Sequence, residues 1–202
     1  MLGRAPRRLD SALVQGKRIA VVGFAPFGAH AVNPSAEVVR ALAGDAGLVT
    51  TVLPVAWRRA EEALLVWLDS ARPAALLLLG RCDGDAIRLE RVALNLDDAP
   101  SADDEGERRS GVPIRPEGPV GHWSTLPLEA FARALASRAL PYAWSHDAGG
   151  FLCNHVFFVA REWVEARRPG MPCGFVHLPP PEALSLERQV EGVRACLALL
   201  SA

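Results

Sequence analysis

Apolar residues along this chain follow two patterns, short continuous runs and recurrences at helical spacing. Such runs are typical of strands that are buried on both faces of a parallel sheet. Strands are predicted at 18–24, 48–55, 74–80, 142–148 and 174–179. Between them, the helical spacing predicts helices at 34–43, 57–71, 128–140, 153–168 and 184–200. Strands that alternate with helices predict an α/β fold class: a three-layer α/β/α single domain with a mostly parallel central sheet.

Two segments do not fit this alternation of apolar strands and amphipathic helices. Residues 87–95 alternate strictly, which predicts one strand with two distinct faces. Glu90 would share a face with Val92 and Leu94, where an unpaired carboxylate is costly, so we expect Glu90 to have a partner. Residues 97–127 are rich in Asp, Glu, Gly, Pro and Ser and show no period, which predicts a long loop.

Size and charge narrow the class of protein. A chain of 202 residues, half of them apolar, is expected to bury one core, so we divide it into an N-terminal extension (1–17) and a single α/β domain (18–202). The net charge of -1 disfavours nucleic acid and anionic membranes as partners. The basic N-terminal segment has no continuous apolar stretch of the kind that a signal peptide needs, so a cytoplasmic location is expected.

The four cysteines form no CxxC pair, so reduced thiols are expected. Cys153 differs from the others because it stands between Gly149–Gly150 and a predicted helix. A free cysteine is most often a buried packing residue. At a helix N-terminus, however, the dipole favours the thiolate, and the free backbone N–H groups can form an oxyanion hole. Position in the sequence leaves both interpretations open.

Two further side chains fit a nucleophilic reading of Cys153. His177 stands near the end of the last predicted strand, where a core histidine is an equally good interpretation. Glu90 supplies a carboxylate on another strand. A cysteine nucleophile, a histidine base and a carboxylate that orients the imidazole form a recognised catalytic combination. No His, Cys and Asp cluster has the spacing of a zinc site, so no zinc site is expected.

Four motifs make the interpretation more specific. They read GFAPFGAHAVNPS, IRLERVALN, AGGFLCNHVFF and GFVHLP, in chain order. Their order and spacing resemble those of the pyrrolidone carboxyl peptidases, also called pyroglutamyl peptidases type I, from about Arg18 to the last helix. The resemblance implies a cysteine exopeptidase that removes an N-terminal pyroglutamyl residue from peptides through a thioester intermediate, without a metal or cofactor. It also implies assembly as a homotetramer.

By the same resemblance, Glu90, Cys153 and His177 form the catalytic triad. The residues expected to bind substrate are Phe24, Phe27, Asn33, Arg81, Phe151 and Leu152. Arg81 stands about where the family often has a glutamine that contacts the lactam, and Pro100 stands where the family often has an arginine.

These departures keep two alternatives open. One is a related cysteine amidase whose altered loop accepts another N-blocked substrate. The other is a non-catalytic protein that binds N-blocked peptides. A retained triad favours the two enzymes over the binder, because a binder has no need of a nucleophile, a base and an orienting carboxylate together.

Overall fold

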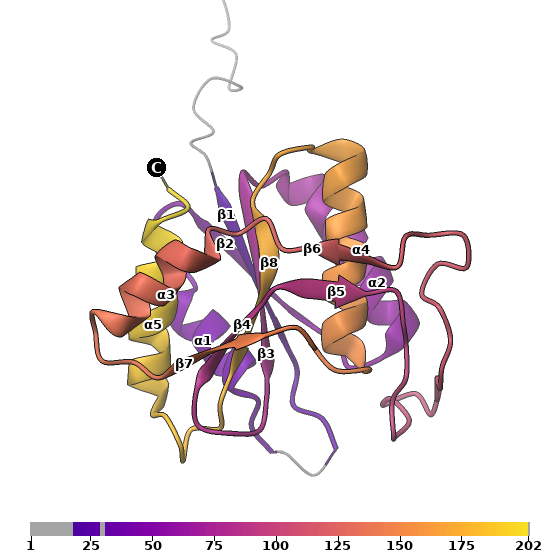
Figure 1. The fold of residues 1–202 in the computed structure, drawn as a ribbon, viewed down its shortest axis with the longest axis horizontal. Helices are drawn as coiled ribbons and strands as arrows, with labels where there is room; N and C mark the ends of the chain where they lie inside the picture. The colour runs from indigo at the N-terminus through magenta and orange to yellow at the C-terminus, as the bar shows by residue number, and fades with distance from the viewer. Residues whose placement is uncertain (1–17, 29–30, 202) are drawn as a thin grey trace, which may run out of the picture.

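A six-stranded sheet forms the centre of the molecule in the computed structural model, which describes residues 18–28 and 31–201 (Figure 1). Its order is β2-β1-β3-β8-β4-β7. The strands are β1 (Ile19–Phe24), β2 (Leu48–Leu53), β3 (Ala75–Arg81), β4 (Ile87–Glu90), β7 (Tyr142–Ser145) and β8 (Cys173–Leu178). Strands β2, β1, β3 and β8 are parallel, whereas β4 runs antiparallel to β8 and parallel to β7. The mostly parallel sheet is thus confirmed, and the predicted extension at 1–17 lies outside the described residues.

Helices cover both faces of this sheet, which confirms the three-layer α/β/α prediction (Figure 1). One face is covered by α1 (Pro34–Leu42), α3 (Leu128–Ala136) and α5 (Leu186–Ala198), and the other by α2 (Trp57–Ala71) and α4 (Leu152–Arg167). Alternate residues of the strands supply the two cores: Leu76 and Leu78 face α2 and α4, while Leu77 and Leu79 face α1, α3 and α5. The strands are therefore apolar on both sides, as their continuous runs predicted.

The prediction of one continuous strand over 87–95 is wrong. The chain leaves the central sheet at Arg91 and continues as β5 (Val92–Leu94) in a separate two-stranded sheet. Leu89 and Glu90 are both fully buried, because β4 lies inside the sheet with cover on both faces. Polar and apolar residues alternate along this segment, but buried and exposed residues do not. Glu90 lies in the central sheet and Val92 and Leu94 in the other, so they share no sheet face.

The predicted loop at 97–127 contains a strand, β6 (Gly121–Trp123), that pairs antiparallel with β5. The two short strands cross the outside of α4 (Figure 1). Part of the remaining segment is held by Asp103, whose carboxylate accepts a hydrogen bond from the Trp57 backbone N–H at the start of α2 (2.8 Å). Polar composition predicted irregular backbone correctly, but the β5–β6 pairing depends on a partner outside the segment.

Candidate active site

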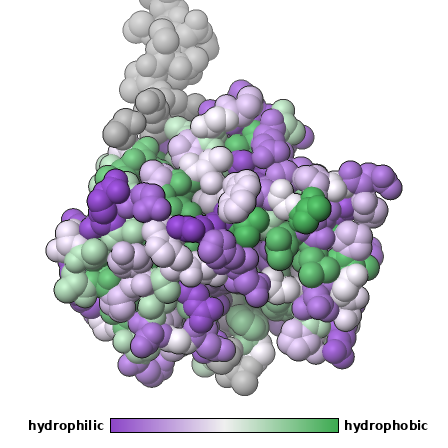
Figure 2. Space-filling view, in the orientation of Figure 1, coloured by the Kyte–Doolittle hydropathy of each residue, from purple (hydrophilic) through white to green (hydrophobic). Residues whose placement is uncertain are grey.

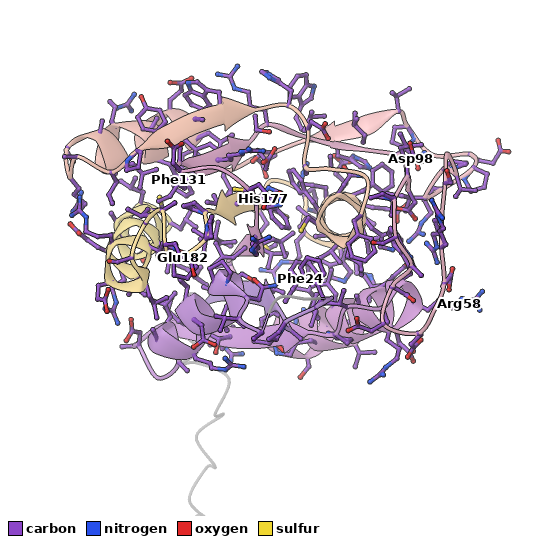
Figure 3. The ribbon with its side chains drawn as sticks, turned by 90° about the horizontal axis from the view of Figure 1, so that it is seen from below. Phe24, Arg58, Asp98, Phe131, His177 and Glu182 are labelled. Carbon is purple, nitrogen blue, oxygen red and sulfur yellow. The ribbon has the colours of Figure 1, made fainter. Side chains whose placement is uncertain are left out.

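The site is assembled on β8 and its two neighbouring strands. Residues Phe175 and His177 of β8 face the α4 side of the sheet, and Glu90 of β4 is the direct partner of Phe175 in the antiparallel register. His177 and Glu90 are therefore diagonal neighbours on one face, close enough for long side chains to meet. The imidazole Nδ1 of His177 lies 2.8 Å from Oε1 of Glu90. His177 is thus the predicted partner of the buried carboxylate, and it lies in the interior of the molecule (Figure 3).

Cys153 reaches the same place from the helical layer. It is the second residue of α4, directly after a turn in which Gly149 has φ +83°. Glycine adopts this left-handed conformation without strain, so the chain can reverse sharply into the helix. Backbone N–H groups in the first helical turn have no carbonyl four residues earlier in the helix to bind. The thiol therefore lies at an end of α4 where free donors and the positive end of the helix dipole coincide.

Gly80 of β3 makes room for the thiol. It is the register partner of His177 in the parallel β3–β8 pair. A Cβ added at Gly80 would lie 2.8 Å from the Cys153 Sγ and 2.7 Å from the ring of Phe175. Phe175 in turn packs against the His177 ring, with centroids 4.7 Å apart. Any side chain at residue 80 would therefore press on the thiol and, through Phe175, on the imidazole.

We expect Gly80→Ala to lower kcat/KM for a pyroglutamyl substrate by about a hundredfold or more, because a displacement of about 1 Å in a catalytic group can cost that much. Gly192→Ala is the matched control. Gly192 is a buried glycine of α5 whose added Cβ would meet only side-chain methyl groups at 3.1 Å, away from Cys153. Steady-state kinetics of both variants check the prediction, and equal activity in the two would contradict it.

The imidazole and the thiols differ in how readily they ionise. Burial acts to lower the pKa of His177, but Cys153 and then Glu90 outweigh it and raise the pKa to about 9. Burial raises the pKa of the Cys82 thiol to about 11, and raises those of Cys173 and Cys196 to about 12. Of the four cysteines, all of which the structure describes, Cys153 is the partly exposed one.

The residues that we expect to bind substrate fall into two groups by exposure. Phe24 and Leu152 are almost fully buried, at 3% and 2%. Phe24 packs against Phe175 beneath the site (Figure 3). Phe27 and Phe151 are partly exposed and pack against each other, with ring centroids 6.0 Å apart. The accessible aromatic surface beside Cys153 is therefore offered by Phe27 and Phe151.

Asn33 and Arg81 both have partners within the protein, and for Asn33 the sequence predicts this, because Asn33 before Pro34 is typical of a helix N-cap. The Asn33 side chain caps α1: its Oδ1 accepts from the Ser35 N–H at 3.1 Å and its Nδ2 donates to the Ala25 carbonyl at 3.1 Å. Arg81 pairs with Asp83 (3.2 Å) and lines a groove of about 640 Å³ beside α1 and the start of α5. Contact of either residue with substrate stays a prediction.

Sequence reasoning missed the residues that hold the first turn of α4. Asn154, which follows the cysteine, is 1% exposed. Its Nδ2 donates to the carbonyls of Leu94 (2.9 Å) and Leu96 (2.8 Å), and its Oδ1 accepts from the Leu94 N–H (2.8 Å). An asparagine early in a helix and next to a candidate nucleophile was the available signal. Its side chain joins the helix to the strand that continues from Glu90.

The described residues offer neither a metal site nor a membrane-spanning helix. No three His, Cys, Asp or Glu side chains within 18–28 and 31–201 are grouped as ligands of a metal ion. No helix in those ranges combines the length and the apolar character needed to cross a membrane.

Comparison with known proteins gives the relatives of this chain. The model of the pyroglutamyl peptidase family matches residues 17–199. The pyrrolidone-carboxylate peptidase of Bacillus cereus (strain G9842) is 34% identical over 168 residues, which are 81% of this chain and 78% of the relative. The crystal structure of Bacillus amyloliquefaciens pyroglutamyl peptidase I has a TM-score of 0.88 at 30% identity and covers 92% of this chain and 97% of that chain. Pyrrolidone carboxyl peptidase from Pyrococcus furiosus has a TM-score of 0.86 at 30% identity, over 90% of this chain and 97% of that chain.

Proposed function

This chain belongs to the pyroglutamyl peptidase family, whose members are cysteine peptidases that remove N-terminal pyroglutamate, and we propose that it does so with Cys153, His177 and Glu90 as its catalytic residues. The observation that carries the proposal is the position of His177. Its Nδ1 lies 2.8 Å from Oε1 of Glu90, and its register partner Gly80 is the residue beside which the Cys153 Sγ lies, so the three side chains meet at one place. That is the geometry of a nucleophile, a base and an orienting carboxylate.

The chemistry follows from these contacts. His177 accepts the thiol proton of Cys153, and Glu90 fixes the imidazole and stabilises its charged form. The raised pKa of His177 means that its charged form is stabilised beside Cys153 and Glu90, which favours the ion pair that this transfer produces. The thiolate attacks the carbonyl carbon of the pyroglutamyl residue, and a tetrahedral intermediate with a negative oxygen results.

The intermediate then collapses with help from the helix and the imidazolium. The backbone N–H of Cys153 and a neighbouring donor at the start of α4 stabilise the oxyanion. The C–N bond to the peptide breaks, and the departing amine takes a proton from His177. Water, activated by the now neutral imidazole, hydrolyses the thioester, which releases pyroglutamate and restores the thiol.

Recognition of the blocked terminus requires an uncharged pocket, because a pyroglutamyl residue has no ammonium group. The partly exposed rings of Phe27 and Phe151 offer apolar walls for the flat lactam ring. Phe24 and Leu152 back these walls from inside the core. An acidic anchor, which an aminopeptidase needs for a charged terminus, is not required for this substrate.

Hydrolysis of a pyroglutamyl fluorogenic amide tests the proposed function. We expect turnover of this substrate and much lower kcat/KM for the prolyl and free glutaminyl amides, since the first carries a charged amine and lacks the lactam carbonyl and the second has an open, charged chain. Equal or better cleavage of either analogue would favour an amidase of different specificity. Binding of pyroglutamyl peptides with no cleavage would favour a binding protein.

The raised pKa of His177 predicts a pH dependence of stability. A group whose pKa is higher in the folded state than in the unfolded state adds stability that is fully present below its unfolded pKa of 6.5 and is lost as the pH rises through its folded value of about 9. We therefore expect the free energy of unfolding of the wild type, relative to His177→Gln, to be largest near pH 6 and to shrink toward pH 9. Urea titrations across this range measure it, with exposed His146→Gln as the control. A constant difference would contradict the assignment.

The cellular setting is also part of the proposal. The four unpaired thiols support a reducing compartment, the cytoplasm, as the place where the enzyme works. The family resemblance supports a homotetramer. Hydrophobic residues gather on the side of the molecule that carries β5 and β6, which supports self-association (Figure 2). Val120 (87% exposed) and Trp123 (67% exposed), next to and in β6, are large apolar side chains that such an interface would cover. Analytical ultracentrifugation measures the oligomeric state.

A further inference from the structure

A second buried histidine lies on α4, two residues after Cys153. His155 is 1% exposed and lies between two carboxylates. Its Nδ1 is 3.0 Å from Oδ2 of Asp97, and its Nε2 is 3.1 Å from Oε2 of Glu61 on α2. A neutral imidazole has one N–H donor and one bare nitrogen, so in that form one carboxylate would face a lone pair. Both contacts are favourable only when His155 is an imidazolium, and the two carboxylates raise its pKa against the effect of burial.

Charges around His155 support the same protonation state. Arg109 pairs with Asp97 and Glu107, and Arg115 pairs with Glu61 and Glu162. Arg58 also pairs with Glu107, so with a neutral His155 three guanidinium groups would face four carboxylates, and Asp97, the carboxylate nearest to Nδ1, is buried. The hydrogen bond from His155 is also the largest influence that lowers the pKa of Glu61 to about 2. The network therefore ties three separate elements together through one buried cation: α2, α4 and the segment that contains Asp97.

The segment that contains Asp97 is in direct contact with the glycine turn before Cys153. The backbone N–H of Asp98, next to the His155 partner, donates to the Gly150 carbonyl at 2.8 Å. A Cβ at Gly150 would lie 2.1 Å from the Asp98 carbonyl oxygen, so the two backbones are in direct contact. This contact links the His155–Asp97 pair to the glycine turn before Cys153.

The same histidine also supports the aromatic wall of the site. The ring of Trp57 packs edge-on against His155 (centroids 5.4 Å apart) and against Phe151 (5.1 Å). Phe151 immediately precedes α4 and is one of the partly exposed rings beside Cys153. A displacement of His155 would therefore move both the turn before Cys153 and, through Trp57, the ring of Phe151.

We propose that His155 is a positioning residue for the reaction: as an imidazolium held between Asp97 and Glu61, it fixes the first turn of α4 and so the place of the Cys153 thiol relative to His177. This inference deepens the proposed function and rests on Cys153 being the nucleophile. His155 does not touch the reacting atoms. It acts through the Asp97–Asp98 segment and the glycine turn.

The test is His155→Gln, which keeps an N–H donor for one carboxylate but turns an oxygen toward the other and removes the charge. We expect kcat to fall by about ten- to a hundredfold, with a smaller change in KM, since misplacement of a catalytic group acts mainly on the chemical step. The rate of Cys153 alkylation by iodoacetamide should fall in parallel. Both are measured below the melting temperature found by circular dichroism, so that the variant is folded.

His122→Gln is the matched control, because His122 is also buried and paired with a glutamate of α4, Glu165, twelve positions beyond Cys153.

A second variant covers the case in which His155→Gln does not fold. Glu61→Gln removes one carboxylate of the pair from a side chain that is 25% exposed, and we expect a several-fold fall in kcat and in the alkylation rate. In the double variant His155→Gln/Glu61→Gln, part of the loss in His155→Gln should be recovered, since the carboxylate that faces the glutamine oxygen is gone. A coupled, non-additive pair of this kind is the signature of one network.

Three results would overturn the proposal. The first is a folded His155→Gln variant that melts earlier but keeps the wild-type kcat and alkylation rate, because His155 would then stabilise the fold only. The second is an equal loss in His122→Gln. The third is a His155→Gln variant that does not fold together with a Glu61→Gln variant of wild-type kcat and alkylation rate. Alkylation needs no substrate, so failure to cleave pyroglutamyl amides would contradict the proposed function while the role of His155 would still be decided.

Discussion

Cys153→Ser is expected to reduce turnover of a pyroglutamyl amide to the limit of detection, a loss on the order of 10⁴-fold or more. A serine hydroxyl of the same size is a much weaker nucleophile than a thiol in this position, because the thiol ionises far more readily. The substitution leaves the α4 turn and Gly80 undisturbed, so the loss would report on chemistry. Steady-state kinetics with the fluorogenic amide measure it.

The other three cysteines are the controls for this prediction. Burial raises the pKa values of the Cys82, Cys173 and Cys196 thiols to about 11, 12 and 12, so they should react slowly. Their single serine variants should keep most of the activity, and one equivalent of iodoacetamide should label Cys153 first and stop turnover. Fast labelling of a different thiol, with activity retained, would exclude Cys153 as the nucleophile.

Glu90→Gln and His177→Ala should both cost on the order of a thousandfold or more in kcat, for different reasons. The glutamine retains the shape of Glu90 but removes the charge that stabilises the imidazolium and holds its tautomer. Loss of His177 removes the proton acceptor itself, so its cost should be at least as large. The side chains are 2.8 Å apart and almost fully buried, which leaves little room for water to replace either one.

The double variant Glu90→Gln/His177→Ala separates a triad from two independent groups. If Glu90 works through His177, the double variant should be little slower than His177→Ala, since an orienting carboxylate has no catalytic effect once the imidazole is absent. Steady-state kinetics distinguish the two cases. The two single variants and the double variant are measured at one pH and over one series of substrate concentrations. Losses that multiply in the double variant would mean that Glu90 acts on the substrate or on Cys153 directly, and that the catalytic unit is a cysteine–histidine pair.

Much of the architecture was already determined by the sequence. Continuous apolar runs such as 74–80 predicted strands buried on both faces, and helical spacing predicted α2 with the bounds that the structure has, Trp57–Ala71. These features are local: a buried strand needs apolar residues on both sides, and an amphipathic helix needs an apolar stripe, whatever lies opposite. The sequence around Cys153 likewise predicted that this cysteine stands at the start of a helix, because a glycine turn and the following helix are encoded by adjacent residues.

What only the tertiary structure decided depends on partners that are distant in sequence. The break at Arg91 and the β5–β6 pair could not be seen in residues 87–95, since the neighbours that bury Glu90 and that pair with Val92 come from elsewhere in the chain. The sequence predicts Gly80 only as the last residue of a strand, and its contact with Cys153 depends on how α4 packs on the sheet. The 2.8 Å contact between Glu90 and His177 joins positions 87 residues apart. Residue types can suggest a triad, but strand register and helix packing set the distances on which its chemistry depends.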